Sequence, residues 1–201
     1  RKNLSLAYRR MKMGYYTFPK PVKIVASLIY RHEGQRDKAV AGLIRKFGPI
    51  DGPSMDIDFD QTDYYYPEFG APLKRRMICF ARHSSLEKAW EIKRVSNAME
   101  KALENGGKRT VNIDPGYLND SKLVLFSTKD HAHRIYLSKG IFVELTLQYR
   151  AGTFRPLSST YPDYASERMV SYFNEVRSVY MKGLMPDSTR GRRRSFDVIQ
   201  K

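Results

Sequence analysis

Apolar residues in the first part of the chain follow the spacing of a strand and then of a helix. Residues 22–30 (VKIVASLIY) form an almost continuous apolar run rich in β-branched side chains, which predicts a strand. Apolar residues then recur at helical spacing over residues 39–47, and Gly48-Pro49 ends this helix. A strand that is apolar on both faces must be covered on both, so we expect residues 22–30 at the centre of a sheet.

The next stretch predicts two strands and a second helix. Residues 55–60 alternate between apolar side chains and aspartates, as in a half-buried strand. A loop over residues 62–72 leads to another strand over residues 73–82. Ser84 and Glu87 fit a capping box, which predicts that a helix begins directly after Ser84.

A strand predicted over residues 108–113 completes the order β-α-β-β-α-β, which is that of the ferredoxin-like, or split βαβ, arrangement. Short strands and turns follow, with strands over residues 122–128, 134–137, 141–149 and 154–157. The last helix spans about 165–182, with Asp163 as its N-cap and with Gly183 and Pro186 at its end. We therefore predict an α+β fold, in which a ferredoxin-like half is extended by an antiparallel β meander and a C-terminal helix.

Length and charge divide the chain into one domain and two basic ends. The 201 residues carry a formal net charge of +15, which by itself is typical of nucleic-acid-binding proteins. Residues 1–23 hold seven Lys/Arg and no acid, and residues 182–201 hold six Lys/Arg against two Asp. We predict a basic N-terminal extension (1–19), a single α+β domain (20–184) and a basic C-terminal tail (185–201). The C-terminal tail is either solvated or an arm that binds RNA, DNA or an anionic membrane. The N-terminal extension is a leader, an RNA-binding arm or sequence upstream of a start near Met11 or Met13.

The cysteine content and the hydropathy limit the cellular setting. Cys79 is the single cysteine, which excludes an internal disulfide and a zinc site built from cysteines. The sequence has no run of 18 apolar residues, and we expect no signal peptide. We expect a cytoplasmic protein without a membrane span.

Several familiar catalytic and binding motifs are missing. Residues 106–110 (GGKRT) come nearest to a phosphate-binding loop, but they lack its first glycine, carry Arg109 in place of the hydroxyl that binds Mg²⁺, and lead into a strand. The chain is therefore not a P-loop GTPase. It has no Gly-x-Ser-x-Gly elbow, Cys79 lies in an apolar strand, and the RNA-recognition signature of alternating aromatics is absent.

Two sequence patterns, one of aspartates and one of histidines, have features of metal-binding sites. The alternating aspartates of residues 56–60 form either a cation-binding comb or, as we favour, a solvated face balanced by Lys74 and Arg76. His131 and His133 have the spacing of a metal-binding pair, but a further carboxylate is needed and no spacing supplies it. We assign no metal to either pattern.

Polar residues are densest between residues 112 and 134, where cations, carboxylates and imidazoles suit the binding of an anion or the transfer of a proton. Asp114-Pro115-Gly116 also has the composition of a turn. The candidate acid/base residues are Asp114, Asp130, His131 and His133. The candidate ligand-binding residues are Asp63, Tyr64, Lys74, Arg75, Lys122, Lys129 and Arg134.

If these residues form a site, they must meet at one pocket. We expect that pocket to be joined by Asp63 or Lys74 and to be lined by at least four of Asp114, Lys122, Asp130, His131, His133 and Arg134.

Six sequence blocks in one order support a resemblance to a known family. They are FGPID (47–51), TDYY (62–65), LKRR (73–76), NIDPGY (112–117), TKDHAHRIY (128–136) and TYPDY (160–164). With these blocks the chain resembles the prokaryotic domain-of-unknown-function family 4416 from about Pro19 to Leu184. Members are often labelled GTP-binding, which the motifs here do not support. The family implies no established activity and adds no catalytic residue, and the basic ends fall outside the resemblance.

We expect the domain to bind an anionic small molecule, such as a nucleotide or a phosphorylated metabolite. Whether it catalyses a reaction, which cofactor it takes and how it assembles stay open. The alternatives are a non-catalytic RNA- or ribosome-associated module that uses the basic ends, and a scaffold without a ligand.

Overall fold

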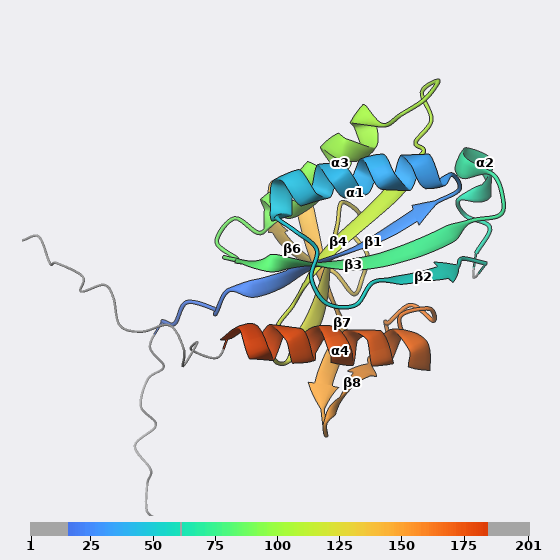
Figure 1. Cartoon of the computed structure of the whole chain (residues 1–201). Coiled ribbons are helices and arrows are strands. Elements are labelled where there is room, and N and C mark those ends of the chain that lie inside the picture. The colour runs from blue at the N-terminus through green and yellow to red at the C-terminus, as the bar shows by residue number, and fades with distance from the viewer. Residues whose placement is uncertain (1–15, 61, 185–201) are drawn as a thin grey trace, which may run out of the picture.

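A computed structural model describes residues 16–60 and 62–184 of the chain (Figure 1). Its elements, in chain order, are β1 (Val22–Tyr30), α1 (Glu33–Phe47), β2 (Met55–Asp58), α2 (Tyr66–Phe69), β3 (Lys74–Ser84), α3 (Trp90–Ala102), β4 (Val111–Leu118), β5 (Lys122–Ser127), β6 (Ile135–Ser138), β7 (Ile141–Arg150), β8 (Thr153–Pro156) and α4 (Glu167–Leu184). The predictions for residues 1–15 and 185–201, including the helix end at Pro186, lie outside the described residues.

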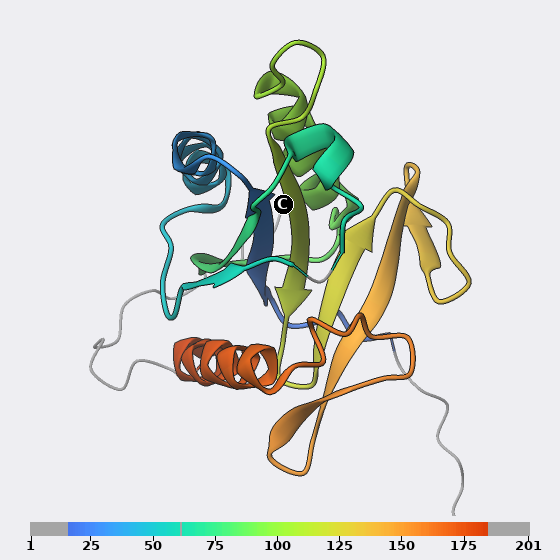
Figure 2. The ribbon, with the colours of Figure 1, turned by 90° about the vertical axis from the view of Figure 1, so that its right-hand side faces the viewer.

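The strands form one eight-stranded sheet in which every pairing is antiparallel. The strand order is β2-β3-β1-β4-β5-β7-β6, and β8 pairs with β7. Helices α1 and α3 cover one face of the sheet, and α4 covers the other (Figures 1 and 2). Each helix thus buries its apolar side against the sheet, which gives three layers.

Strand β1 is central because its apolar side chains fill both cores. All nine of its residues are buried. Ile24 and Leu28 belong to the core beneath α1 and α3, whereas Val25 belongs to the core beneath α4. Lys23 and Ser27 are its buried polar residues, and Lys23 pairs with Asp51 and donates to the Phe80 carbonyl at 3.0 Å.

The α+β prediction and the central place of residues 22–30 are therefore confirmed. The β-α-β-β-α-β half contributes β1, β2, β3 and β4 to the same antiparallel sheet that the later strands continue. The ferredoxin-like description of this half stays a prediction.

Three local predictions are wrong. Ser84 ends β3, and α3 begins only at Trp90 without a side-chain cap, so Ser84 and Glu87 form no capping box. Ser166, whose Oγ accepts a bond from the Met169 amide at 3.3 Å, replaces Asp163 as the residue that caps α4. Residues 66–69, predicted as loop, form the short helix α2. At Ser84 a longer strand overrides the local signal, and at Asp163 an ion pair with Arg75 does so.

Asp114-Pro115-Gly116 does not form a turn; it lies inside β4. The register of β4 with β1 continues through Pro115, but its register with β5 is confined to residues 116–118. A proline is tolerated there because β4 has a partner on only one side. A Cβ on Gly116 would lie 2.5 Å from the Val124 carbonyl oxygen, so glycine allows the two strands to meet at this point.

On the N-terminal side of Gly116, β4 diverges from β5 (Figure 2). The polar side chains at the start of β4 and at the end of β5 are therefore separated within the sheet. This divergence determines where the candidate site lies.

The four helices of the described segments include none that is both long and apolar enough to cross a bilayer.

Candidate functional site

A cavity of about 780 Å³ lies where β4 and β5 separate. Its walls come from α3, from the start of β4, from the end of β5 and from the loops on either side. The lining residues are Phe59, Thr62, Tyr64, Tyr65, Arg75, Lys93, Asn97, Glu100, Arg109, Asn112, Asp114, Leu125, Phe126, Ser127, Thr128, Lys129, His131, Arg134, Glu144, Tyr161, Pro162, Asp163 and Tyr164. Cations, carboxylates and aromatic rings thus line one cavity that is partly open to solvent.

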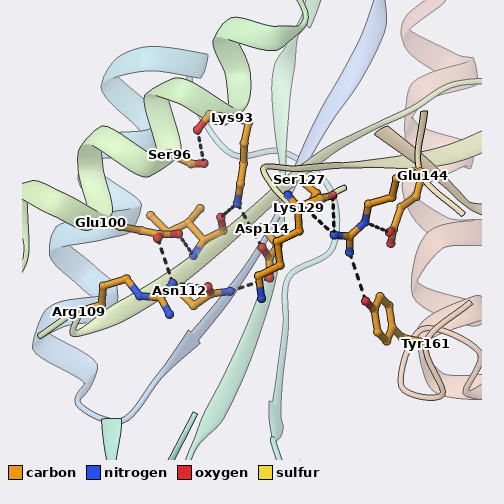
Figure 3. Close-up of polar contacts among 12 residues, drawn as sticks. Lys93, Ser96, Glu100, Arg109, Asn112, Asp114, Ser127, Lys129, Glu144 and Tyr161 are labelled. Atoms are coloured by element: carbon orange, nitrogen blue, oxygen red, sulfur yellow. Dashed lines mark hydrogen bonds and ion pairs between the residues drawn. The ribbon is translucent and has the colours of Figure 1, made fainter. Parts of the chain in front are cut away.

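One side of the cavity, which we call the helix–strand wall, consists of Lys93, Glu100, Arg109, Asn112 and Asp114 (Figure 3). The Lys93 amine reaches Asp114 Oδ1 at 3.3 Å and the Ile113 carbonyl at 2.9 Å. Asn112 donates to the other Asp114 oxygen at 2.6 Å. Both carboxylate oxygens of Asp114 are therefore engaged, which fixes its orientation.

Arg109 links two carboxylates of different burial. It forms a bidentate pair with Glu68, at 2.8 and 2.6 Å, and reaches Glu100 at 3.3 Å. The hydrogen bond from Arg109 lowers the pKa of Glu68. Burial raises the pKa of Glu100, against the nearby charge of Lys93 and the bond from the Ile113 amide. The same arginine therefore faces one carboxylate that favours ionisation and one that resists it.

The opposite side, which we call the loop wall, consists of Tyr64, Ser127, Lys129, His131 and Arg134. Arg134 Nε donates to Glu144 of β7 at 2.7 Å, and its Nη atoms reach Ser127 Oγ at 2.7 Å and the Tyr161 hydroxyl at 3.2 Å. The guanidinium therefore ties the turn after β5 to β7 and to the loop before α4.

In Figure 3, the Lys129 side chain projects into the space between the helix–strand wall and the side chains of Glu144 and Tyr161. Its amine donates to the Tyr64 hydroxyl at 3.0 Å and lies 4.9 Å from the centre of the Tyr64 ring. This hydrogen bond lowers the pKa of Tyr64. Tyr64 is 60% exposed, so the pair lies at the solvent side of the cavity.

Arg75 is the most buried cation of the lining. Its side chain pairs with Asp163, and its guanidinium carbon lies 4.4 Å from the Phe59 ring centre and 5.4 Å from that of Tyr164. Burial raises the pKa of Tyr164. Arg75 Nε is buried and has no hydrogen-bond partner among the described residues, so one donor of this guanidinium is unsatisfied.

The structure brings six of the eleven predicted site residues to the cavity. They are Tyr64, Arg75, Asp114, Lys129, His131 and Arg134. His133 lies just behind the lining, where its Nε2 contacts Glu144 at 3.1 Å. Among the six residues of the 114–134 set, only Asp114, His131 and Arg134 line the cavity, so the expectation of at least four is wrong.

The other predicted residues lie elsewhere. Lys122 is at the opposite end of β5 from Ser127, about 17 Å along the strand. Lys74 pairs with Glu33 at 3.4 Å, so neither it nor the exposed Asp63 joins the cavity from the first half of the chain. Asp130 is exposed and outside the lining.

Sequence reasoning missed the residues that hold the cavity's charges in place, namely Lys93, Glu100, Arg109, Glu144 and Asp163. Three of them carried a signal. Lys93 and Glu100 are two helical turns apart on the buried side of α3, and Glu144 interrupts the apolar residues of β7. A charged residue at a position predicted to be buried implies a partner, although not which one.

The described part of the chain gives neither the aspartates of residues 56–60 nor the His131 and His133 pair the further ligands that a metal site needs. Asp56 and Asp58 lie opposite Arg76 and Lys74 in the register of β2 with β3, as the solvated-face interpretation predicts. Within residues 16–60 and 62–184, no group of three or more His, Cys, Asp or Glu side chains is placed to hold a metal ion. Burial raises the pKa of the Cys79 thiol to about 11, which agrees with a packing role.

Comparison with known proteins gives one match. A family model described as domain of unknown function (DUF4416) matches residues 20–180, which is most of the chain. No curated protein and no solved structure matches it.

Proposed function

Since this chain belongs to the DUF4416 family, whose function is not known, we propose from the cavity that it binds an anionic small molecule, such as a nucleotide or a phosphorylated metabolite. The observation that carries the proposal is Lys129, a cation that lines the cavity next to Tyr64 and has no carboxylate partner among the described residues.

The other cations of the lining are neutralised. Arg75 pairs with Asp163, Lys93 with Asp114, Arg109 with Glu68 and Glu100, and Arg134 with Glu144. These pairs supply fixed donors and acceptors but little net charge. Lys129 is therefore the one cation of the lining that no carboxylate of the described residues neutralises, and His131 adds a further nitrogen donor. An anionic group that enters from solvent meets Lys129 first.

The rest of the lining suits a ligand with a ring and hydroxyl groups. Small-molecule sites commonly measure about 300–1,000 Å³ and are lined by aromatic rings with a few fixed polar groups. The cavity measures about 780 Å³, and its aromatic residues are Phe59, Tyr64, Tyr65, Phe126, Tyr161 and Tyr164. A nucleotide or a sugar phosphate has this combination of a planar or cyclic body and an anionic end.

The proposal concerns binding and does not extend to a reaction. Asp114 is already engaged by Lys93 and Asn112, and Asp130 lies outside the lining. Two of the four predicted acid/base residues thus lack the arrangement that proton transfer to a ligand requires.

The test is a ligand screen on the full-length chain. Nucleoside mono-, di- and triphosphates, sugar phosphates and inorganic phosphate are screened by thermal shift, and hits are measured by calorimetry. We expect at least one phosphorylated compound to raise the melting temperature, and Lys129→Met to weaken its binding about tenfold, or about 1.4 kcal/mol.

Lys122→Met is the matched control, because it removes the same charge at the opposite end of β5. It is expected to bind the hit as the natural chain does. The proposal fails if no compound stabilises the protein, or if Lys122→Met weakens binding as much as Lys129→Met does.

A further inference from the structure

A second concave surface lies between α1 and α3, apart from the cavity described above. It encloses about 640 Å³ and is lined by Lys38, Gly42, Arg45, Lys46, Trp90, Glu91, Arg94, Val95, Ala98, Met99, Ala102 and Leu103. From these residues we infer that the groove is a docking site for an acidic amphipathic helix of a partner protein. The inference does not depend on the proposed ligand.

The floor of the groove is apolar and exists because the two helices approach closely. A Cβ on Gly42 would lie 2.8 Å from Met99 Cε, so glycine leaves room for the methionine. Val95 and Met99 are half-buried, and Ala98 projects little from α3. Methionine adapts its shape to different apolar side chains, which suits a surface that accepts another helix.

The rim of the groove is cationic. Lys38, Arg45, Lys46 and Arg94 are all exposed, whereas Glu91 is the one acidic residue that lines the groove. Within the described part of the chain, none of the four cations has an ion-pair partner. Four unpaired cations around an apolar floor form a pattern complementary to apolar residues flanked by carboxylates.

The same charges argue against other occupants. The basic ends of this chain have the sign of the rim, and a second copy of this face would place like charges together. A nucleic acid would satisfy the cations but has no aliphatic side chains for the floor. Trp90, the aromatic residue of the lining, is already contacted by Arg94, whose guanidinium lies 5.5 Å from its ring centre.

The dimensions suit a short helix. The lining residues of α3 extend from Trp90 to Ala102, which is about 18 Å of helix. Helices bound in grooves present apolar residues at positions i, i+3 or i+4, and i+7. A partner helix of about three turns with such an apolar stripe, and with Asp or Glu beside it, fills this length.

The test uses the full-length chain and a fluorescein-labelled 16-residue peptide in which Leu recurs at i, i+3, i+4 and i+7 and Glu and Ala fill the other positions. Anisotropy is expected to show saturable binding. A scrambled peptide of the same composition, and a peptide with Lys in place of Glu, are expected to bind at least tenfold more weakly.

Two variants locate the binding. R45E/K46E is expected to weaken it at least tenfold. The matched reversal K139E/R150E, at exposed sites outside the groove, is expected to change it less than twofold. Ala98→Trp fills the groove without changing charge and is expected to weaken binding as strongly, provided that circular dichroism matches that of the natural chain.

Three outcomes would overturn the inference: no saturable binding of the amphipathic peptide, equal binding of the scrambled peptide, or equal losses in R45E/K46E and K139E/R150E. A single-stranded oligonucleotide that binds more tightly than the peptide and loses affinity in R45E/K46E would instead make the groove a nucleic-acid site.

Discussion

The two sides of the cavity differ in how their charges are held. In the helix–strand wall, every carboxylate contacts more than one donor, and the residues come from α3, from β4 and from the loop that joins them. In the loop wall, four hydrogen bonds hold Arg134. Among the described residues, the Lys129 side chain contacts only the hydroxyl and the ring of Tyr64, on another loop. The helix–strand wall is thus a preformed network of hydrogen bonds and ion pairs, whereas the loop wall contains an exposed cation, Lys129.

This difference has a physical reason and a functional meaning. Buried charges must be paired, because leaving one without a partner costs several kcal/mol, whereas an exposed lysine is solvated by water. The helix–strand wall therefore stabilises the fold and presents a fixed surface. The loop wall is free to exchange water for a ligand, so binding is expected to depend on it most strongly.

The largest expected effect is the loss of Glu100. Glu100→Ala leaves the Ile113 amide without its 2.6 Å acceptor and removes one partner of Arg109, so we expect a loss of about 3 kcal/mol in the free energy of unfolding. Urea denaturation measures it. The control is Glu104→Ala, four residues later, where an ion pair with the exposed Lys101 is lost and less than about 1 kcal/mol is expected. Equal losses of stability in Glu100→Ala and Glu104→Ala would mean that the polar network of the helix–strand wall does not stabilise the fold.

A smaller and more local effect is expected in the loop wall. Glu144→Ala removes the acceptor shared by Arg134 and His133, but Arg134 keeps its bonds to Ser127 and Tyr161. We expect a loss of about 2 kcal/mol. Hydrogen exchange is expected to rise mainly in residues 128–134. Uniform exchange across the sheet would contradict the separation of the two walls.

Glu100 and Glu68 are expected to give opposite pH dependences, although both contact Arg109. The pKa of Glu100 is raised by burial, so its contribution to stability is present below the ordinary glutamate pKa of about 4.3 and is lost as the pH rises through the raised value. The pKa of Glu68 is lowered by Arg109, so its contribution is present above about 4.3 and is lost as the pH falls through the lowered value.

Unfolding free energies measured from pH 3 to pH 8 test this pair. Relative to the natural chain, Glu100→Gln is expected to gain stability as the pH rises above the ordinary glutamate range. Glu68→Gln is expected to lose less stability than the natural chain on acidification. Parallel curves for both variants would refute the assignment.

The smallest effect on stability is expected at Lys129. Lys129→Met is expected to change the unfolding free energy by less than about 0.5 kcal/mol, because the side chain is exposed. The pKa of Tyr64 is expected to rise toward its ordinary value when the hydrogen bond from Lys129 is removed. NMR titration of labelled tyrosine, assigned with Tyr64→Phe, measures this change, and Lys122→Met is expected to leave it unaltered.

Local sequence patterns were sufficient to predict those strands and helices in which buried and exposed positions follow the regular spacing of the element. The nine buried residues of β1 are an uninterrupted apolar run, and the helices have the expected apolar spacing. The predictions at Ser84 and Asp163 failed because each residue has a nonlocal role: Ser84 continues the pairing of β3 with β1, and Asp163 pairs with Arg75. A polar residue before a helix signals a cap only when no distant partner competes for it.

The sequence also predicted several of the charged residues that line the cavity, but it did not predict which of them meet there. Lys129, Arg134 and His131 are close together in the chain and meet at the cavity, whereas Lys122 belongs to the same strand as Ser127 and lies at its far end. Position along a strand sets this difference, since each residue adds about 3.3 Å.

The sequence by itself determined the α+β class and the central strand, because the spacing of apolar residues within an element indicates which of its side chains are buried. Only the tertiary structure decided that Asp114-Pro115-Gly116 continues β4 and that β4 separates from β5 on the N-terminal side of Gly116. It also decided which charges meet, such as Arg75 with Asp163, 88 residues apart. Strand register and ion pairing join residues distant in the chain, so no local pattern contains them.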